Sequence, residues 1–225
     1  MIPELQFPLQ KIIKPSLAHQ LEILHIIKLL NLTPPKNIMD FGSGNGRIAI
    51  PLLRMGFNLW AVDISYESLK QLTITYNRLK TNSWGKLYTS TTIPKKIEFD
   101  AVVGSDILHH VTIEDKLHDI LRTLKPNGMI VFSEPNAWHF PWYIYVFFLL
   151  SWNIEKGILH CSIPELNQKL ASTGFDNIKI EGHGLFPTLL SNNFPYLARL
   201  NALYLGNIPL LRYFAFRLIV AARKF

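Results

Sequence analysis

Short apolar runs alternate with segments of helical apolar spacing along most of this chain. The runs predict strands at 37–41, 58–63, 86–91, 99–104, 129–133, 177–181 and 214–222. Helical spacing between them predicts helices at 17–31, from the glycines after 41 to about 55, 66–80, 112–124 and 163–172. Such alternation favours a parallel sheet with right-handed crossovers and helices on both faces. We therefore predict an α/β fold.

Two apolar segments interrupt the alternation, one after the fifth strand at 135–160 and one after the sixth at 184–212. The first contains an aromatic stretch of eleven residues, Trp142 to Trp152. A helix that spans a bilayer needs about 20 residues, so this stretch is too short. We predict one domain over 1–225, with both segments as lid or substrate insertions.

A membrane surface is one candidate partner for these insertions. Tryptophans at the edges of an apolar stretch are typical of interfacial anchors, and arginines near the second insertion are candidates for contact with anionic headgroups: Arg199, Arg212 and Arg217. An ordinary lid that buries its own apolar face and a dimer surface are the alternatives.

The candidate chemistry begins where the first strand ends. Gly42, Gly44 and Gly46 alternate there, so the backbone can turn sharply and a ligand can approach it closely. The amides that open the following helix favour anionic or hydrogen-bond-accepting ligands, although Pro51 is expected to kink that helix. Asp63 ends the second strand about twenty residues after the first glycine, where a carboxylate can accept both ribose hydroxyls. Together these features predict a nucleoside ligand.

Five motifs in this order carry a family resemblance: Asp40–Gly46, Ala61–Ser65, Phe99–His110, Leu124–Ile130 and Ala171–Phe175. The chain resembles a class I S-adenosylmethionine-dependent methyltransferase of the small-molecule type, similar to the ubiquinone/menaquinone methyltransferases. The resemblance covers about 20–182 and the last strand. It implies a Rossmann-like, doubly wound, seven-stranded sheet whose last strand is antiparallel to the others.

The resemblance also implies that S-adenosyl-L-methionine lies across the carboxyl ends of strands one to four. The implied cofactor-binding residues are Asp40, Gly42, Ser43, Gly44 and Gly46 around the methionine part, Asp63 at the ribose, Ile64 at the adenine, and Ser105 and Asp106 on the methyl-donor side. One departure is visible, because the family usually has an acid after the third strand and this chain has Thr89–Thr92 there.

Methyl transfer from a sulfonium requires alignment of donor and acceptor, and a base only if the acceptor must lose a proton. His109 and His110 follow the fourth strand and are the candidate catalytic bases. The candidate acceptor-side residues are Glu134, Asn136, Trp138, His139 and His160. A packing role is the alternative for each histidine, and a loop-closing hydrogen bond is the alternative for Glu134. No metal is expected.

Composition narrows the classes of partner. The formal charge is +7, but the basic residues are scattered, which does not favour nucleic acid. Hydrophobic residues make up 48% and charged residues 17%, so an apolar or lipid-like acceptor and peripheral contact with a membrane are favoured. Cys161 is the single cysteine, and the expected compartment is the cytoplasm or the membrane surface facing it. The sequence leaves the acceptor atom and the oligomeric state open.

Two other functions compete with methyl transfer. A nicotinamide-dependent dehydrogenase would have its third glycine one residue later, where Arg47 stands. A degenerate member of the family would bind a partner or a membrane without catalysis, and the missing acid after the third strand is its main support.

Overall fold

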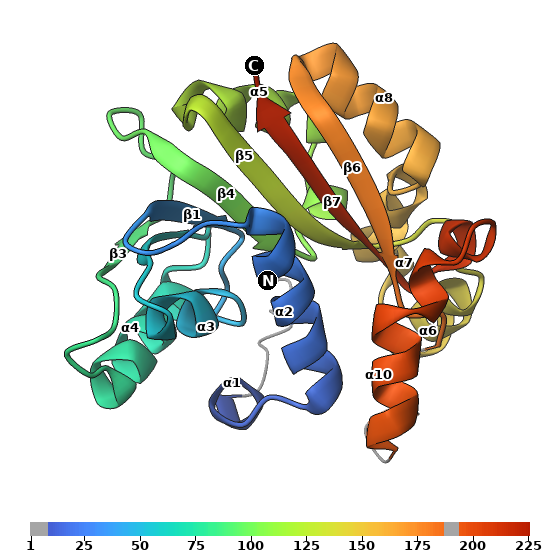
Figure 1. Cartoon of the computed structure of the whole chain (residues 1–225), viewed down its shortest axis with the longest axis horizontal. Helices are drawn as coiled ribbons and strands as arrows, with labels where there is room; N and C mark the ends of the chain where they lie inside the picture. The colour runs from blue at the N-terminus through green and yellow to red at the C-terminus, as the bar shows by residue number, and fades with distance from the viewer. Residues whose placement is uncertain (1–8, 187–193) are drawn as a thin grey trace.

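One seven-stranded sheet organises the protein, in the strand order β3-β2-β1-β4-β5-β7-β6 (Figure 1). The computed structural model describes residues 9–186 and 194–225. The strands are β1 Asn37–Phe41, β2 Asn58–Val62, β3 Leu87–Ser90, β4 Phe99–Ser105, β5 Leu124–Pro135, β6 Phe175–His183 and β7 Arg217–Lys224. Strands β3, β2, β1, β4 and β5 pair in parallel, whereas β7 is antiparallel to both of its neighbours. The predicted doubly wound sheet with an antiparallel last strand is confirmed.

Helices cover both faces of the sheet. The described helices are α1 Leu9–Ile13, α2 Leu17–Leu30, α3 Ala49–Arg54, α4 Tyr66–Leu79, α5 Ile113–Thr123, α6 Pro141–Leu149, α7 Trp152–Glu155, α8 Ile163–Thr173 and α10 Pro195–Leu203. Apolar side chains of α2, α3 and α4 form a core on one face, and those of α5 and α8 form a second core on the other. Successive strand residues serve opposite faces: Ile38 lies in the first core and Met39 in the second, both fully buried.

Two local predictions need correction. Pro51 does not interrupt a helix, because α3 begins at Ala49 and the proline lies in its first turn, where a backbone N–H has no intrahelical partner. Strand β5 also begins earlier than expected. Leu124 already pairs with Phe99, and the chain then bulges before Met129 pairs with Ala101.

Helices of both insertions, α6, α7 and α10, lie toward the end of the molecule away from α4 (Figure 1). Three side chains of the first insertion bond to backbone carbonyls that directly precede β7: Asn136 to Tyr213 and Ala215, His139 to Phe214, and Trp142 to Phe216. Helix α10 of the second insertion packs on α2 through Leu21, Ala198 and Ala202. Within the described ranges, no helix has the length and apolar character needed to cross a membrane.

Candidate active site

The glycine turn at the carboxyl end of β1 forms the first wall of the site. The amides of Gly42 and Ser43 donate to the Val62 carbonyl at the end of β2, at 2.8 and 3.1 Å. Gly42, Gly44 and Gly46 all have positive φ, at 74°, 49° and 104°. Residues that have a Cβ rarely adopt this left-handed backbone conformation, so the turn requires glycine at these positions.

The three glycines differ in what lies beside them. A Cβ at Gly42 would lie 2.5 Å from Ile107, and a Cβ at Gly46 would lie 2.5 Å from Leu72. Among the residues that the structure describes, a Cβ at Gly44 would meet nothing within 4 Å. Gly42 and Gly46 therefore allow the turn to pack closely against Ile107 and Leu72. Gly44 instead leaves open space beside its Cα.

Asp63 links the turn to the end of β2. One of its carboxylate oxygens accepts from the Gly44 amide at 2.7 Å, and the other accepts from the Ser65 amide at 2.9 Å. Ile64, between Asp63 and the cap of α4, is 94% exposed. A carboxylate beside an exposed apolar side chain is the arrangement that the sequence predicts for a ribose and an adenine.

Asp40 is the buried carboxyl of the site. It is 1% exposed, and neither of its carboxylate oxygens has a hydrogen-bond partner among the described residues. Burial, and then the nearby charge of Asp63, raise the pKa of Asp40 to about 8, and the Ala49 backbone amide opposes this in part. With a pKa of about 8 this carboxyl is largely protonated at neutral pH, and a cationic group bound beside it would favour its ionised form.

A network of buried ion pairs forms the floor beneath the ends of β4 and β5. Arg217 on β7 donates to Asp106 at 2.7 Å and to the Ser133 hydroxyl at 2.8 Å. Arg47, after the glycine turn, pairs with the other oxygen of Asp106 and with Glu22 of α2. Glu22 also accepts a hydrogen bond from the Ser133 hydroxyl at 2.6 Å and forms an ion pair with Arg217 at 3.2 Å, so that both arginines contact both acids.

These pairs keep the acids ionised. Burial would raise the pKa of Asp106, but Arg217 and Arg47 hold it at about 2. The same two arginines hold the pKa of Glu22 well below its ordinary value against the effect of burial. Asp106 has a left-handed backbone, with φ 57°, and Ser105 beside it accepts from Arg217 at 3.1 Å. Ser105 and Asp106, predicted on the methyl-donor side, are thus fixed by this network.

Sequence reasoning missed most of this floor and assigned Arg217 to the wrong environment. Arg217 is 4% exposed and ion-paired, so it does not contact lipid headgroups. A charged residue within the apolar run 214–222 was the available signal, since such a residue is buried only when paired. Glu22 carried a similar signal, because it lies four residues from Ala18 and Ile26 on the buried face of α2.

His109, the first candidate base, is held between two carboxylates. Its Nδ1 lies 2.7 Å from Glu134 and its Nε2 lies 3.4 Å from Glu155 of α7. Burial opposes protonation, but hydrogen bonds to Glu134 and Glu155 raise the pKa of His109 to about 10. His109 is therefore an imidazolium at neutral pH and has no lone pair with which to accept a proton.

Glu134 is fully buried and both of its oxygens are engaged. One bonds to His109, and the other accepts from the Ile107 and Leu108 amides at 3.0 Å each. This is the loop-closing arrangement, and it leaves no oxygen facing an acceptor.

His110 differs from its neighbour in exposure and protonation. Its side chain is exposed, and its ring lies over that of His109 with centroids 3.9 Å apart. Partial burial, and then the positive charge of His109, lower the pKa of His110 below its ordinary 6.5. His110 is therefore the member of the pair that is neutral at physiological pH.

The other predicted acceptor-side residues have varied surroundings. Asn136 is fully buried with its amide and its oxygen bonded to backbone, so it is a structural residue. His139 is buried against the Phe214 carbonyl, and burial lowers its pKa. His160 pairs with Glu165 at 2.7 Å on the exposed start of α8. Trp138 is 45% exposed and stacks on Tyr213, which follows the second insertion.

The sheet order, the glycine turn and the acid after β2 define the class I, Rossmann-like methyltransferase fold. A family profile described as "Methyltransferase domain" matches residues 17–180. The chain belongs to this methyltransferase family, and the resemblance drawn from its motifs is confirmed.

Curated relatives and solved structures extend the comparison. A ubiquinone biosynthesis O-methyltransferase of Rickettsia typhi is 33% identical over 106 residues, covering 44% of this chain and 41% of that protein. The corresponding protein of Rickettsia canadensis is 25% identical over 157 residues, with 64% of each chain covered. The chain therefore matches less than two thirds of the length of these relatives.

Among solved structures, phosphoethanolamine N-methyltransferase 2 of Haemonchus contortus has a TM-score of 0.63 at 18% identity, over 90% of this chain and 52% of that one. A putative S-adenosylmethionine-dependent methyltransferase of Listeria monocytogenes also has a TM-score of 0.63, at 15% identity, over 93% of this chain and 99% of that one. At these identities the likeness supports the fold alone.

Proposed function

We propose that this chain transfers a methyl group from S-adenosyl-L-methionine to a hydroxyl of a small apolar acceptor, such as a prenylated or lipid-like ring. The observation that carries the proposal is the buried, unpaired carboxyl of Asp40 beside the open backbone of Gly44. An ammonium or sulfonium cation compensates such a carboxyl, and a bare amide backbone accommodates the ligand that carries it.

The residues around Asp40 and Gly44 fit S-adenosyl-L-methionine. Asp40 and Gly44 would hold the methionine part, Asp63 the ribose hydroxyls, and the exposed Ile64 the adenine. When bound, the cofactor supplies an electrophilic methyl group on sulfur. The stretch after β3 has no acid for the adenine amino group, and Ser90 there donates its hydroxyl hydrogen to the Thr92 carbonyl.

Two observations favour an oxygen acceptor. The Rickettsia relatives are named O-methyltransferases, and His110 offers a neutral imidazole after β4. In the transfer, the acceptor oxygen forms a bond to the methyl carbon while the carbon–sulfur bond breaks and its electron pair stays on sulfur. The hydroxyl proton passes to His110. His109 and Glu134 position this loop rather than touch the acceptor.

The direct test is titration of the purified chain with S-adenosylmethionine, S-adenosylhomocysteine and NAD, followed by transfer of labelled methyl to prenylated catechols. We expect micromolar binding of the two sulfur nucleosides, none of NAD, and label on a hydroxyl oxygen. Turnover should rise with pH through a pKa below 6.5 and then level off, because the neutral form of His110 is the base.

The variant His110→Gln should lower kcat by about 100-fold or more while leaving cofactor binding unchanged, in the range typical of a lost general base. His160→Gln is the matched control, since the side chain of His160 is 61% exposed and pairs with Glu165 of α8. Cofactor binding without transfer to any hydroxylated acceptor would support the degenerate, non-catalytic alternative.

Peripheral contact with an anionic membrane is a second, finer part of the proposal. Helix α6 exposes Phe147 and Phe148 at 81% and 74%, and the neighbouring Leu149 at 69%. Contiguous exposed apolar side chains of this kind mark interaction surfaces. By contrast, Trp142 stacks on Phe216 at 4.7 Å, so it supports the insertion and is a poor choice for a membrane anchor.

We expect the double variant Phe147→Ser, Phe148→Ser to reduce co-sedimentation with phosphatidylglycerol vesicles by tenfold or more. Burial of one phenylalanine side chain is worth about 1.5–3 kcal/mol, and about 1.4 kcal/mol is a factor of ten. Ile74→Ser on α4 is the control, because Ile74 is 52% exposed and α4 lies at the other end of the molecule (Figure 1). Equal sedimentation of both variants, or none by the unaltered chain, contradicts membrane contact.

A further inference from the structure

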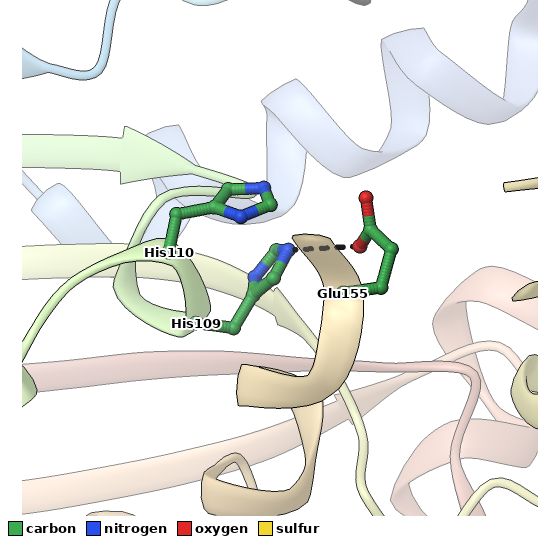
Figure 2. A group of neighbouring side chains, drawn as sticks. All are labelled: His109, His110 and Glu155. Atoms are coloured by element: carbon green, nitrogen blue, oxygen red, sulfur yellow. Dashed lines mark ion pairs between the residues drawn. The ribbon is translucent and has the colours of Figure 1, made fainter. Parts of the chain in front are cut away.

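His109, His110 and Glu155 form a cluster in which each side chain offers one metal-ligating atom. These three atoms all lie within 4.8 Å of one another. Figure 2 shows the two imidazoles one above the other, with the Glu155 carboxylate approaching the same side of the pair. The cluster joins two separate segments, since the histidines lie on the short helix Leu108–His110 after β4 and Glu155 ends α7 in the first insertion.

The surroundings of His109 are those of a ligand already oriented for a metal. Its Nδ1 bonds to the buried Glu134 at 2.7 Å, which leaves Nε2 to face Glu155. Histidines that bind metals usually donate their second ring N–H to a carboxylate or carbonyl in this manner, which fixes the ring and strengthens the ligand. Glu134 is itself fixed by two backbone amides.

The two segments are held together closely. Gly157, two residues after Glu155, lies so near the His109 backbone that a Cβ there would be 1.7 Å from the His109 carbonyl oxygen. The glycine thus permits the first insertion to seat on the histidine loop. Glu155 is 7% exposed, so its carboxylate is directed into the protein rather than into solvent.

We propose that His109, His110 and Glu155 bind one divalent cation of the zinc type. Two imidazoles and one carboxylate are borderline ligands that suit Zn²⁺ and its neighbours rather than Mg²⁺ or Ca²⁺. Because His110 is exposed, a cation there would keep an open coordination position on the accessible side. Three protein ligands with one open position are typical of catalytic zinc sites.

This inference rests on the proposed function and names a refinement of it. A cation beside His110 would bind the acceptor hydroxyl through oxygen and favour loss of its proton to water. The lone pair of the His110 imidazole cannot bind a metal and accept a proton at the same time. When the cation is bound, His110 is therefore a metal ligand and no longer the base. The cation would also displace the proton that now lies between His109 and Glu155.

The test is calorimetric titration of the chelator-treated chain with Zn²⁺ alone, without cofactor or acceptor. We expect one equivalent to bind with micromolar or tighter affinity. Glu155→Gln and His110→Ala should each weaken Zn²⁺ affinity by about 100-fold or more. Loss of a residue that only hydrogen-bonds to a ligand typically costs about 10–100-fold. His160→Ala, which removes an exposed histidine outside the cluster, should bind like the unaltered chain.

Cobalt gives an independent readout. Co²⁺ bound by the cluster should produce visible absorption bands of a four- or five-coordinate site, and these should disappear in Glu155→Gln. Thermal melting of each variant checks that the fold is retained.

The outcomes separate this inference from the proposed function. Absence of Zn²⁺ binding, or binding that is unchanged in Glu155→Gln and His110→Ala, overturns the metal site. Binding of S-adenosylhomocysteine and methyl transfer that resists chelators would then still support the proposed function with His110 as the base. Zn²⁺ binding with the expected losses upholds the site even if no acceptor is methylated.

Discussion

Replacement of Gly44 by valine is expected to abolish S-adenosylhomocysteine binding, with at least a 100-fold loss of affinity, while the chain remains folded. A Cβ at this position meets no atom of the described residues (9–186 and 194–225) within 4 Å. The added methyl groups would therefore occupy the space proposed for the ligand. Calorimetric titration of the variant measures the loss.

Backbone strain must be separated from steric exclusion of the ligand. Gly44 has φ 49°, and a side chain in the left-handed region costs about 1–2 kcal/mol of stability. Gly56→Val is the matched control, since Gly56 has φ 92° and its Cβ would have only ordinary contacts, the nearest at 3.5 Å, with Pro34 and Ser83. Both variants should melt at lower temperature, but Gly56→Val should keep its affinity. Undiminished binding by Gly44→Val would assign the turn a purely structural role.

Replacement of Arg217 by methionine is expected to lower the free energy of unfolding by about 3–5 kcal/mol, the range for removal of one partner of a buried ion pair. Arg217 is 4% exposed and pairs with both Asp106 and Glu22. Methionine would fill much of the volume but leave these carboxylates with less positive charge nearby. Urea unfolding at neutral pH measures the change.

Two comparisons define the cause of this loss. Arg122→Met removes an arginine whose side chain is 80% exposed beside Asp119, and it should change stability by no more than about 0.5 kcal/mol. Addition of Glu22→Gln to Arg217→Met should restore part of the loss, since it removes one of the stranded charges. If Arg217→Met unfolds like Arg122→Met, the network does not hold the site floor.

The fold was predictable because its signals are local. Most strands are short apolar runs, and the helices between them are marked by apolar spacing and by caps such as Ser65, whose hydroxyl accepts from the Ser68 amide. Errors arose where tertiary contacts decide the outcome. Strand β5 starts at Leu124 because Phe99 offers a pairing partner, and no local pattern records that partner.

The site was predictable in part for the same reason. The glycine turn and the acids Asp40 and Asp63 lie in short motifs that follow strands, where the sheet topology brings them together. The ionic floor joins Glu22, Arg47, Asp106 and Arg217 from four separate parts of the chain, so its members become neighbours only in the folded state.

The two adjacent histidines show what sequence alone could not distinguish. His109 and His110 are the same residue type at neighbouring positions, yet one is held as a cation and the other as a neutral ring. Glu155 and Glu134, from distant segments, raise the pKa of His109 to about 10, and the charge of His109 helps to lower the pKa of His110.

The strand order also has a consequence for the way this protein is made. Strand β7 lies between β5 and β6, although it follows β6 in the chain. As the ribosome releases the chain, β6 has no strand to pair with in this sheet until β7 has emerged. Arg217, the first residue of β7, reaches Asp106 at the same moment. The edge of the sheet and the floor of the site are therefore completed only once β7 has been synthesised, and a nascent chain without β7 exposes an unpaired strand.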